Sequence, residues 1–240
     1  MTDPIFDNVH SVNAWADCEP QTLRISIDTK ATVHVGEYSR GGRSRGSKPV
    51  AALDHEMMPK QKLMPGGILE PVEGRAFVFF TQSNKTSEFV VDGLRLWWAS
   101  RKPDLGHVRR LVINLDNGPE CSSHRRHFLQ MLAQFADQEN LEIRLDYYPP
   151  YHSKYNNIER YWGGLEHSWN GYLLDSVQAV LERAGNFVWR THRTTVSLID
   201  KVYDKGITLS TSKKKTLEKR LVRSDTLPWW DVTIRPQTVC

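Results

Sequence analysis

The stretch RLVINLDNGPE, residues 110–120, decides the fold. Its β-branched and apolar run predicts a buried strand from Arg110 to Leu115. The letters DNGP that follow are all turn residues, so the strand must end at Asp116. Ligands of α/β proteins gather at strand ends of this kind. Asp116 is therefore a candidate functional residue.

Helices and strands alternate on both sides of this strand. Residues 87–101 repeat apolar side chains at helical spacing, and residues 122–140 predict a second helix with a serine at its N-cap. Residues 141–148 predict another strand, which two prolines close, and a third helix follows. This order predicts parallel strands joined by right-handed helical crossovers.

The segment before residue 87 has a different pattern. Residues 22–39 alternate apolar and polar side chains over two short strands, with a hairpin-like break at DTK, and residues 75–83 predict a third strand. We therefore expect an α/β fold with a mixed five-stranded sheet flanked by helices. Its first three strands are expected to be antiparallel.

The chain divides into three expected regions. Residues 1–20 are expected to be a connector with only a short helix, Pro4–Ala16, and residues 21–170 are expected to form the main α/β domain. Residues 171–240 are expected to form a basic, mainly helical extension. The net charge is +4, but residues 201–240 alone carry nine Lys or Arg against four Asp or Glu.

Composition excludes several classes of protein. The chain has 240 residues, of which 39% are hydrophobic, enough for a sizeable core. Its longest apolar runs are short and no signal peptide is seen, so we expect a cytoplasmic protein without a membrane partner. Three cysteines without a CxxC pair argue against a disulfide framework or a thiolate zinc site.

Three carboxylates fall at the ends of expected elements. Asp28 lies at the end of the first strand, Asp116 at the end of the fourth, and Glu159 about one turn into the helix after the fifth. If the first and fourth strands are neighbours, Asp28 and Asp116 lie close together, and the helix can bring Glu159 to them. Crowded carboxylates repel one another unless a hard cation such as Mg²⁺ neutralises them.

Each carboxylate also has a structural explanation. An aspartate at a turn more often caps or shapes that turn, and a glutamate in the first turns of a helix is favoured by the helix dipole. The coincidence of all three positions favours a metal site. Two ions roughly 3.5–4 Å apart could activate a nucleophile and stabilise the leaving oxygen in phosphoryl transfer.

Several long motifs occur in a recognisable order: LRISIDTK, SRGGRSRG, LVINLDNGPE, YYPPYHSKYNNIERYWG and LPWWDVTIRP. They resemble the DDE transposases of bacterial insertion sequences, specifically the ISAzo-type or Rhodopirellula-type family. The resemblance implies the RNase H-like fold of retroviral integrases for residues 21–170. It also implies that Asp28, Asp116 and Glu159 are the catalytic, metal-binding triad for two Mg²⁺ ions, for which Mn²⁺ can substitute.

The resemblance gives roles to residues near the triad. Asn117 and Gly118 would shape the turn after the second aspartate, while His152, Lys154 and Asn156 would line the DNA path near the third ligand. His152 and Lys154 could equally be ordinary surface residues.

Two basic segments suit contacts with DNA phosphates by their composition alone. The first is Gly-rich and contains Arg40, Arg43 and Arg45, and the second is the run Lys213, Lys214 and Lys215. A solvated basic surface explains either segment about as well.

The implied activity is Mg²⁺-dependent cleavage of transposon ends and strand transfer into target DNA. The implied partners are double-stranded DNA and further copies of the chain in a synaptic complex. Two departures from the family are noted: Asn157 stands where the pattern usually has proline, and nothing before Thr22 could supply the usual N-terminal helix-turn-helix region. The alternatives are an RNase H-like nuclease and a truncated DNA-binding or regulatory remnant without activity.

Overall fold

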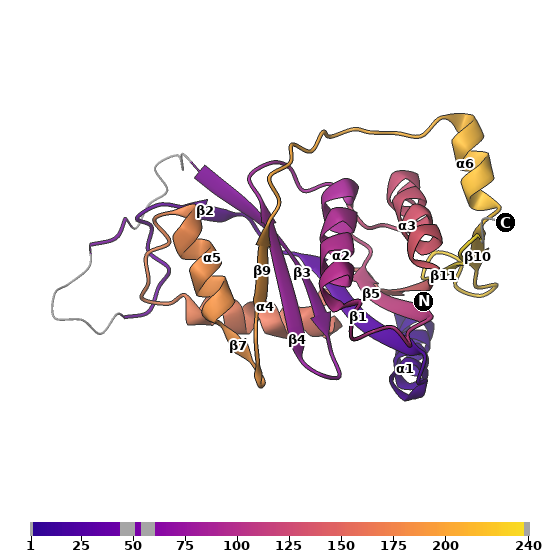
Figure 1. Ribbon diagram of the computed structural model, residues 1–240, viewed down its shortest axis with the longest axis horizontal. Coiled ribbons are helices and arrows are strands. Elements are labelled where there is room, and N and C mark those ends of the chain that lie inside the picture. The colour runs from indigo at the N-terminus through magenta and orange to yellow at the C-terminus, as the bar shows by residue number, and fades with distance from the viewer. Residues whose placement is uncertain (1, 44–50, 54–60, 238–240) are drawn as a thin grey trace.

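The computed structural model describes residues 2–43, 51–53 and 61–237. A single mixed sheet runs through the molecule, with helices on both of its faces (Figure 1). The helices are α1 (Thr2–Cys18), α2 (Ser87–Arg101), α3 (Arg126–Glu139), the 3₁₀ turn η1 (Ser153–Tyr155), α4 (Asn157–Ser168), α5 (Val177–Asn186) and α6 (Thr211–Glu218). The strands are β1 (Thr22–Thr29), β2 (Val33–Val35), β3 (Gln61–Glu70), β4 (Arg75–Thr81), β5 (Arg110–Asp116), β6 (Glu142–Tyr148), β7 (Val188–Trp189), β8 (His192–Arg193), β9 (Thr195–Leu198), β10 (Leu221–Arg223) and β11 (Asp231–Ile234).

The five central strands follow the expected mixed pattern. Their order is β4-β3-β1-β5-β6. Strand β3 is antiparallel to both β1 and β4, whereas β1, β5 and β6 are parallel. The prediction that the first and fourth predicted strands, β1 and β5, are neighbours in the sheet is confirmed.

The prediction for residues 22–39 and the segment after them was partly wrong. Strand β1 does not form a hairpin with β2; both pair with β3, which the sequence analysis missed. Strand β3 contains Pro65, Gly66 and Gly67, and proline and glycine normally argue against a strand interior. Here the two glycines make room for large rings: a Cβ on Gly66 would lie 2.5 Å from Phe79, and one on Gly67 would lie 2.7 Å from Trp162.

The C-terminal region is not mainly helical, which corrects the expectation. Strand β9 adds to the sheet beside β4, and β11 pairs with β6 while β10 pairs with β11. With these three strands and β2, which pairs with β3, the sheet of the described residues has nine strands, not five. The added strands are only three or four residues long, too short to show a clear alternating pattern in the sequence.

The N-terminal region forms a packed helix, in place of the expected connector. Helix α1 has 17 residues, and its buried side chains Ile5, Val9, Val12 and Ala16 lie on one face at helical spacing. Val12 and Ala16 pack on Val112 of β5. The N-terminal region is thus part of the sheet's cover (Figure 1).

Alternation along the strands divides the sheet into two unlike faces. Ile25 and Ile27 belong to the apolar core under α2 and α3. The alternate residues of β1, Arg24, Ser26 and Asp28, therefore point to the opposite face. That face is covered by α1, α4 and α5, and it carries buried polar groups as well as a second apolar core. In the described residues, no helix combines the length and apolar character needed to cross a bilayer.

Candidate active site

Two of the three predicted carboxylates lie at the ends of adjacent parallel strands. Ser26 of β1 is opposite Asn114 of β5, and continuing this register by two residues brings Asp28 opposite Asp116. Burial raises the pKa of Asp28 to about 8, and the negative charges of Asp116 and Glu159 add to the increase. The three carboxylates therefore form one electrostatically coupled group.

Asp116 has the same kind of environment. Burial raises its pKa, and the charges of Glu159 and Glu120 raise it further, while the backbone N–H of Gly118 lowers it. A Cβ on Gly118 would lie 3.3 Å from Asp116 Oδ1, so glycine lets the turn fold closely around the carboxylate. The side chain of Asn117 accepts a hydrogen bond of 3.1 Å from the backbone N–H of Ser123, which holds the turn together.

A buried hydrogen-bond cluster fixes the start of α4, where Glu159 lies. The Ser26 hydroxyl donates to Asn156 Oδ1 and accepts a hydrogen bond of 3.1 Å from the backbone N–H of Ile158. Asn156 Nδ2 donates to the carbonyl oxygen of Ile27 at 3.3 Å. These contacts attach the first turn of α4 directly to β1, two residues before Asp28.

The cluster corrects the role expected for Asn156. Its side chain is 1% exposed and both of its polar groups are bonded within the protein, so it does not line a surface that DNA could reach. Asn156 is the N-cap residue of α4, but its side chain makes no capping hydrogen bond. Its contacts position the helix against the sheet.

The apolar face of α4 keeps the helix against β3. Ile158, Trp162 and Leu165 are buried in the second core. Gly67 lies opposite Asp28 in the β1–β3 pairing, and its missing side chain leaves the space for the Trp162 ring. The indole N–H of Trp162 lies near Asp28 and lowers its pKa, yet it is buried without a hydrogen bond of ordinary geometry.

The donor set is all oxygen, which fits a hard divalent cation. The raised pKa values of Asp28 and Asp116 show that negative charge at this edge of the sheet lacks compensation. Within the described part of the chain, no three His, Cys, Asp or Glu side chains are arranged closely enough to enclose a metal ion. The three carboxylates fit such an ion in their chemistry, but in the described residues they are not arranged as a ready-made metal site.

The other residues predicted to contact DNA lie in three places. Arg40 is half-buried and donates to the carbonyl oxygen of His34, so part of its guanidinium is used within the protein. Arg43 is exposed, and Arg45 lies outside the described residues.

The second group lies on the loop between β6 and α4. The His152 ring packs edge-on against Phe6 of α1 at 5.4 Å between centroids, and the Lys154 ammonium lies 5.2 Å from the centre of the Tyr155 ring. Both side chains are therefore near the helix that carries Glu159. Their contact with DNA stays a prediction.

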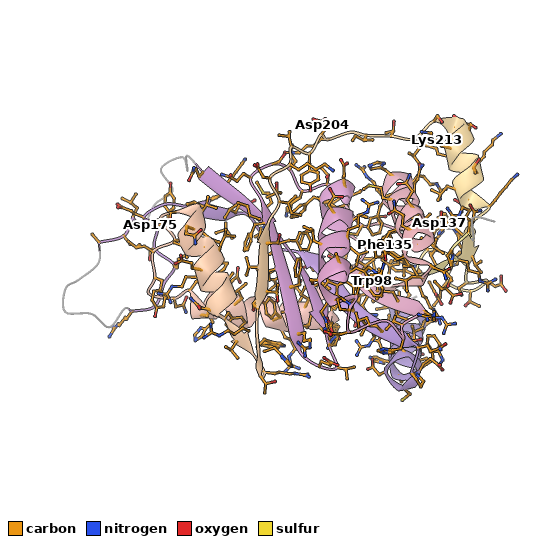
Figure 2. All side chains as sticks on the ribbon, in the orientation of Figure 1. Trp98, Phe135, Asp137, Asp175, Asp204 and Lys213 are labelled. Carbon is orange, nitrogen blue, oxygen red and sulfur yellow. The ribbon has the colours of Figure 1, made fainter. Side chains whose placement is uncertain are left out.

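The third group is exposed on α6. Lys213, Lys214 and Lys215 lie on the helix that packs beside α3, well away from α4 (Figures 1 and 2). The structure therefore does not bring these lysines to the carboxylate cluster. Any DNA that they contact lies at some distance from the triad.

A buried polar network beneath the carboxylates was missed. Arg24 forms a bidentate ion pair with Asp17 of α1, with both N···O distances 2.7 Å, and donates to Asn114 Oδ1 at 3.2 Å. Asn114 Nδ2 in turn donates to Asp146 at 3.2 Å, and Asn8 of α1 donates to the other oxygen of Asp146 at 2.9 Å. Polar residues recurring at every second position of the strands were the signal that could have revealed it.

Comparison with known proteins gives the family of the chain. The model of the Rhodopirellula transposase DDE domain family matches residues 1–236. No curated protein matches the chain.

Among solved structures, the Mos1 transposase paired-end complex with the left transposon end is similar, with a TM-score of 0.52 and 11% identity over 75% of this chain and 51% of that one. A simian T-cell lymphotropic virus intasome, in complex with PP2A regulatory subunit B56 gamma, has a TM-score of 0.43 and 17% identity over 73% and 52% of the two chains. The chain thus spans about half the length of these structures, and at such identities the likeness concerns the fold alone. Because the family model covers residues 1–236, nearly the whole chain, the chain belongs to the Rhodopirellula transposase DDE domain family.

Proposed function

We propose that this chain is the catalytic part of a transposase that cuts DNA at transposon ends and joins the freed 3′-hydroxyl to target DNA. The observation that carries the proposal is the electrostatic coupling of Asp28, Asp116 and Glu159 at the carboxyl end of two parallel strands. The family membership gives this cluster its reaction class.

Asp28, Asp116 and Glu159 would hold the divalent ions, Mg²⁺ or Mn²⁺. Two such ions, when bound, supply activation of the attacking oxygen and stabilisation of the leaving oxygen. The protein's own contribution is placement. The parallel register aligns the two aspartates, and the Ser26–Asn156 cluster holds the first turn of α4 so that Glu159 faces them.

The burial of Asp28 and Asp116 also contributes to the binding of divalent ions. Desolvation and mutual repulsion raise the pKa values of Asp28 and Asp116, which favours the protonated carboxyls in the absence of a cation. Binding of the ions should therefore release protons. The DNA substrate and a homo-oligomeric synaptic complex are part of the proposal, and the Mos1 paired-end complex supplies the precedent.

The test is Asp116→Asn in the full chain, with cleavage of duplex DNA measured in Mg²⁺ and in Mn²⁺. We expect loss of metal-dependent cleavage with unchanged DNA binding, since the substitution removes a charged ligand but keeps the side-chain size. Asp175→Asn is the matched control, because Asp175 is exposed and lies beside α5, away from the triad (Figure 2). Full activity of Asp116→Asn would refute the triad assignment.

The same assay separates the alternatives. An RNase H-like nuclease would release cut strands without joining them to a target, and an inactive remnant would bind DNA without cutting it in either metal. Joined products from the wild-type chain would exclude both.

A further inference from the structure

A basic pocket lies beside the candidate active site and plays no part in the carboxylate cluster. It has a volume of about 440 Å³. Four cationic side chains from separate parts of the chain line it: Lys62 of β3, Lys85 just before α2, Arg125 just before α3, and Lys205 in the segment between β9 and α6. One carboxylate, Glu120, also lines it.

The cations of this pocket are not neutralised within the protein. Among the residues that the structure describes, Lys62, Lys85, Arg125 and Lys205 form no ion pair, although most arginines of the sheet and of α2 do. Lys85 donates to the carbonyl oxygen of Lys30 at 3.1 Å, which directs its ammonium group without cancelling its charge. Four positive charges against one negative charge favour an anionic ligand.

The pocket lies near the ends of β1 and β5 that carry the two aspartates. Thr32 and Pro119 line it. Thr32 lies four residues after Asp28, and Pro119 lies three residues after Asp116. Glu120 lies close enough to Asp116 for its charge to raise the pKa of that carboxyl. A chain of phosphates passing the aspartates could thus reach the pocket directly.

We propose that this pocket binds backbone phosphates of the DNA strand next to the phosphate that is cut. The inference rests on the proposed function, and it names the side of the active site on which the strand continues. Positive side chains that converge without carboxylate partners suit phosphates, and they contact them without reading base sequence. The start of α2 at Thr86 and Ser87 forms one wall of the pocket, and its dipole adds to the preference for anions.

The pocket differs from the basic regions identified in the sequence. Arg40, Arg43 and the lysines of α6 belong to surface segments, whereas the pocket cations come from four separate parts of the chain and meet only in the fold. A lysine such as Lys205 does not by itself indicate a phosphate-binding site in the sequence. The prediction thus depends on the three-dimensional arrangement.

The experiment measures binding of a random-sequence 30-base-pair duplex by fluorescence anisotropy over a series of NaCl concentrations. The variants are Arg125→Ala and Lys205→Ala, alone and combined. Arg193→Ala is the matched control, because Arg193 is exposed on β8, which pairs with β7 outside the main sheet, and it does not line the pocket. Each lost phosphate contact should lower the slope of log K against log [NaCl] by about 1.

We expect the slope to fall by about 1 in each single variant and by about 2 in the double variant, with Arg193→Ala unchanged. Arg125→Lys should keep the wild-type slope, and thermal unfolding of each variant checks that the fold is intact. Slopes equal to that of Arg193→Ala would overturn the proposal. Binding of inorganic phosphate in the pocket, with the same DNA salt slope in the wild type and in the variants, would also overturn the proposal. The pocket would then hold a small anion but not the DNA strand.

Failure of this proposal is distinguishable from failure of the proposed function. Asp116→Asn should abolish cleavage and leave the salt slope intact, whereas the pocket variants should lower the salt slope and Arg193→Ala should change neither cleavage nor slope. A wild-type chain that cuts DNA while the pocket variants bind normally would refute the pocket alone.

Discussion

Replacing Asn156 by alanine tests whether this residue positions α4 or contacts DNA. The substitution deletes the acceptor of the Ser26 hydroxyl and the donor to the Ile27 carbonyl oxygen. Asn156 is 1% exposed, so water does not replace the lost partners in the intact fold. Because Asn156 makes no capping hydrogen bond with its side chain, the loss of helix capping adds nothing to the effect.

The magnitude follows from the two groups left without partners. A buried polar group that loses its hydrogen bond costs about 1–3 kcal/mol, so loss of both partners in Asn156→Ala should lower the free energy of unfolding by about 2–6 kcal/mol. Asn186→Ala is the matched control. Asn186 is exposed at the end of α5 and has no side-chain hydrogen bond, so its replacement should change stability by less than about 0.5 kcal/mol.

The assay combines urea unfolding with cleavage and DNA binding. Asn156→Ala should lose stability and metal-dependent cleavage, because Glu159 then loses its fixed position, while the salt dependence of DNA binding stays unchanged. Ser26→Ala should have a similar effect, and the double variant should cost less than the sum of the two because they share one contact. Unchanged stability with weaker DNA binding would refute the positioning role and restore the DNA contact predicted from the sequence.

Two further predictions follow from the site. Gly67→Ala should destabilise the protein by about 1–3 kcal/mol and reduce cleavage, since its Cβ would lie 2.7 Å from the Trp162 ring of α4. The control is Gly163→Ala, on the exposed side of α4 with nothing within 4 Å, which should be neutral or stabilising in the same urea titration. In the absence of divalent metal, the free energy of unfolding should fall as pH rises from about 4 to about 8. Folded Asp28 keeps its proton up to a pKa of about 8, whereas the unfolded carboxyl ionises near 3.8, so the folded state binds more protons in between. Asp28→Asn should flatten this decline, and an equally steep decline in that variant would contradict the assignment.

The sequence was sufficient for the central strands β1, β4, β5 and β6 because each depends on local signals. Arg110–Leu115 is a β-branched run ended by turn residues, and residues 157–168 have an apolar stripe at helical spacing. These patterns persist in the fold. Parallel neighbours at the centre of the sheet then follow from the order of helices and strands.

Strand β3 and the sheet additions could not be predicted in this way. Gly66 and Gly67 break strand patterns in isolation, and they are compatible with β3 only because Phe79 and Trp162 fill the space above them. Strands β9, β10 and β11 are stabilised by pairing with partners far away in the chain. Such long-range contacts leave no period in the local sequence.

The role of α1 depends on a similar long-range match, and it explains why the carboxylates can be held rigidly. Polar residues at alternate strand positions normally face water, so Arg24, Asn114 and Asp146 would be read as the solvated side of the sheet. In the fold they are buried, and burial of such groups is tolerated only if each finds a partner. Asp17 and Asn8 of α1 supply partners to Arg24 and Asp146. On the same face of the strands, the next residues are Ser26, which fixes α4, and then the candidate ligands Asp28 and Asp116. A helix that seemed a connector therefore supports the polar face on which the active site is built.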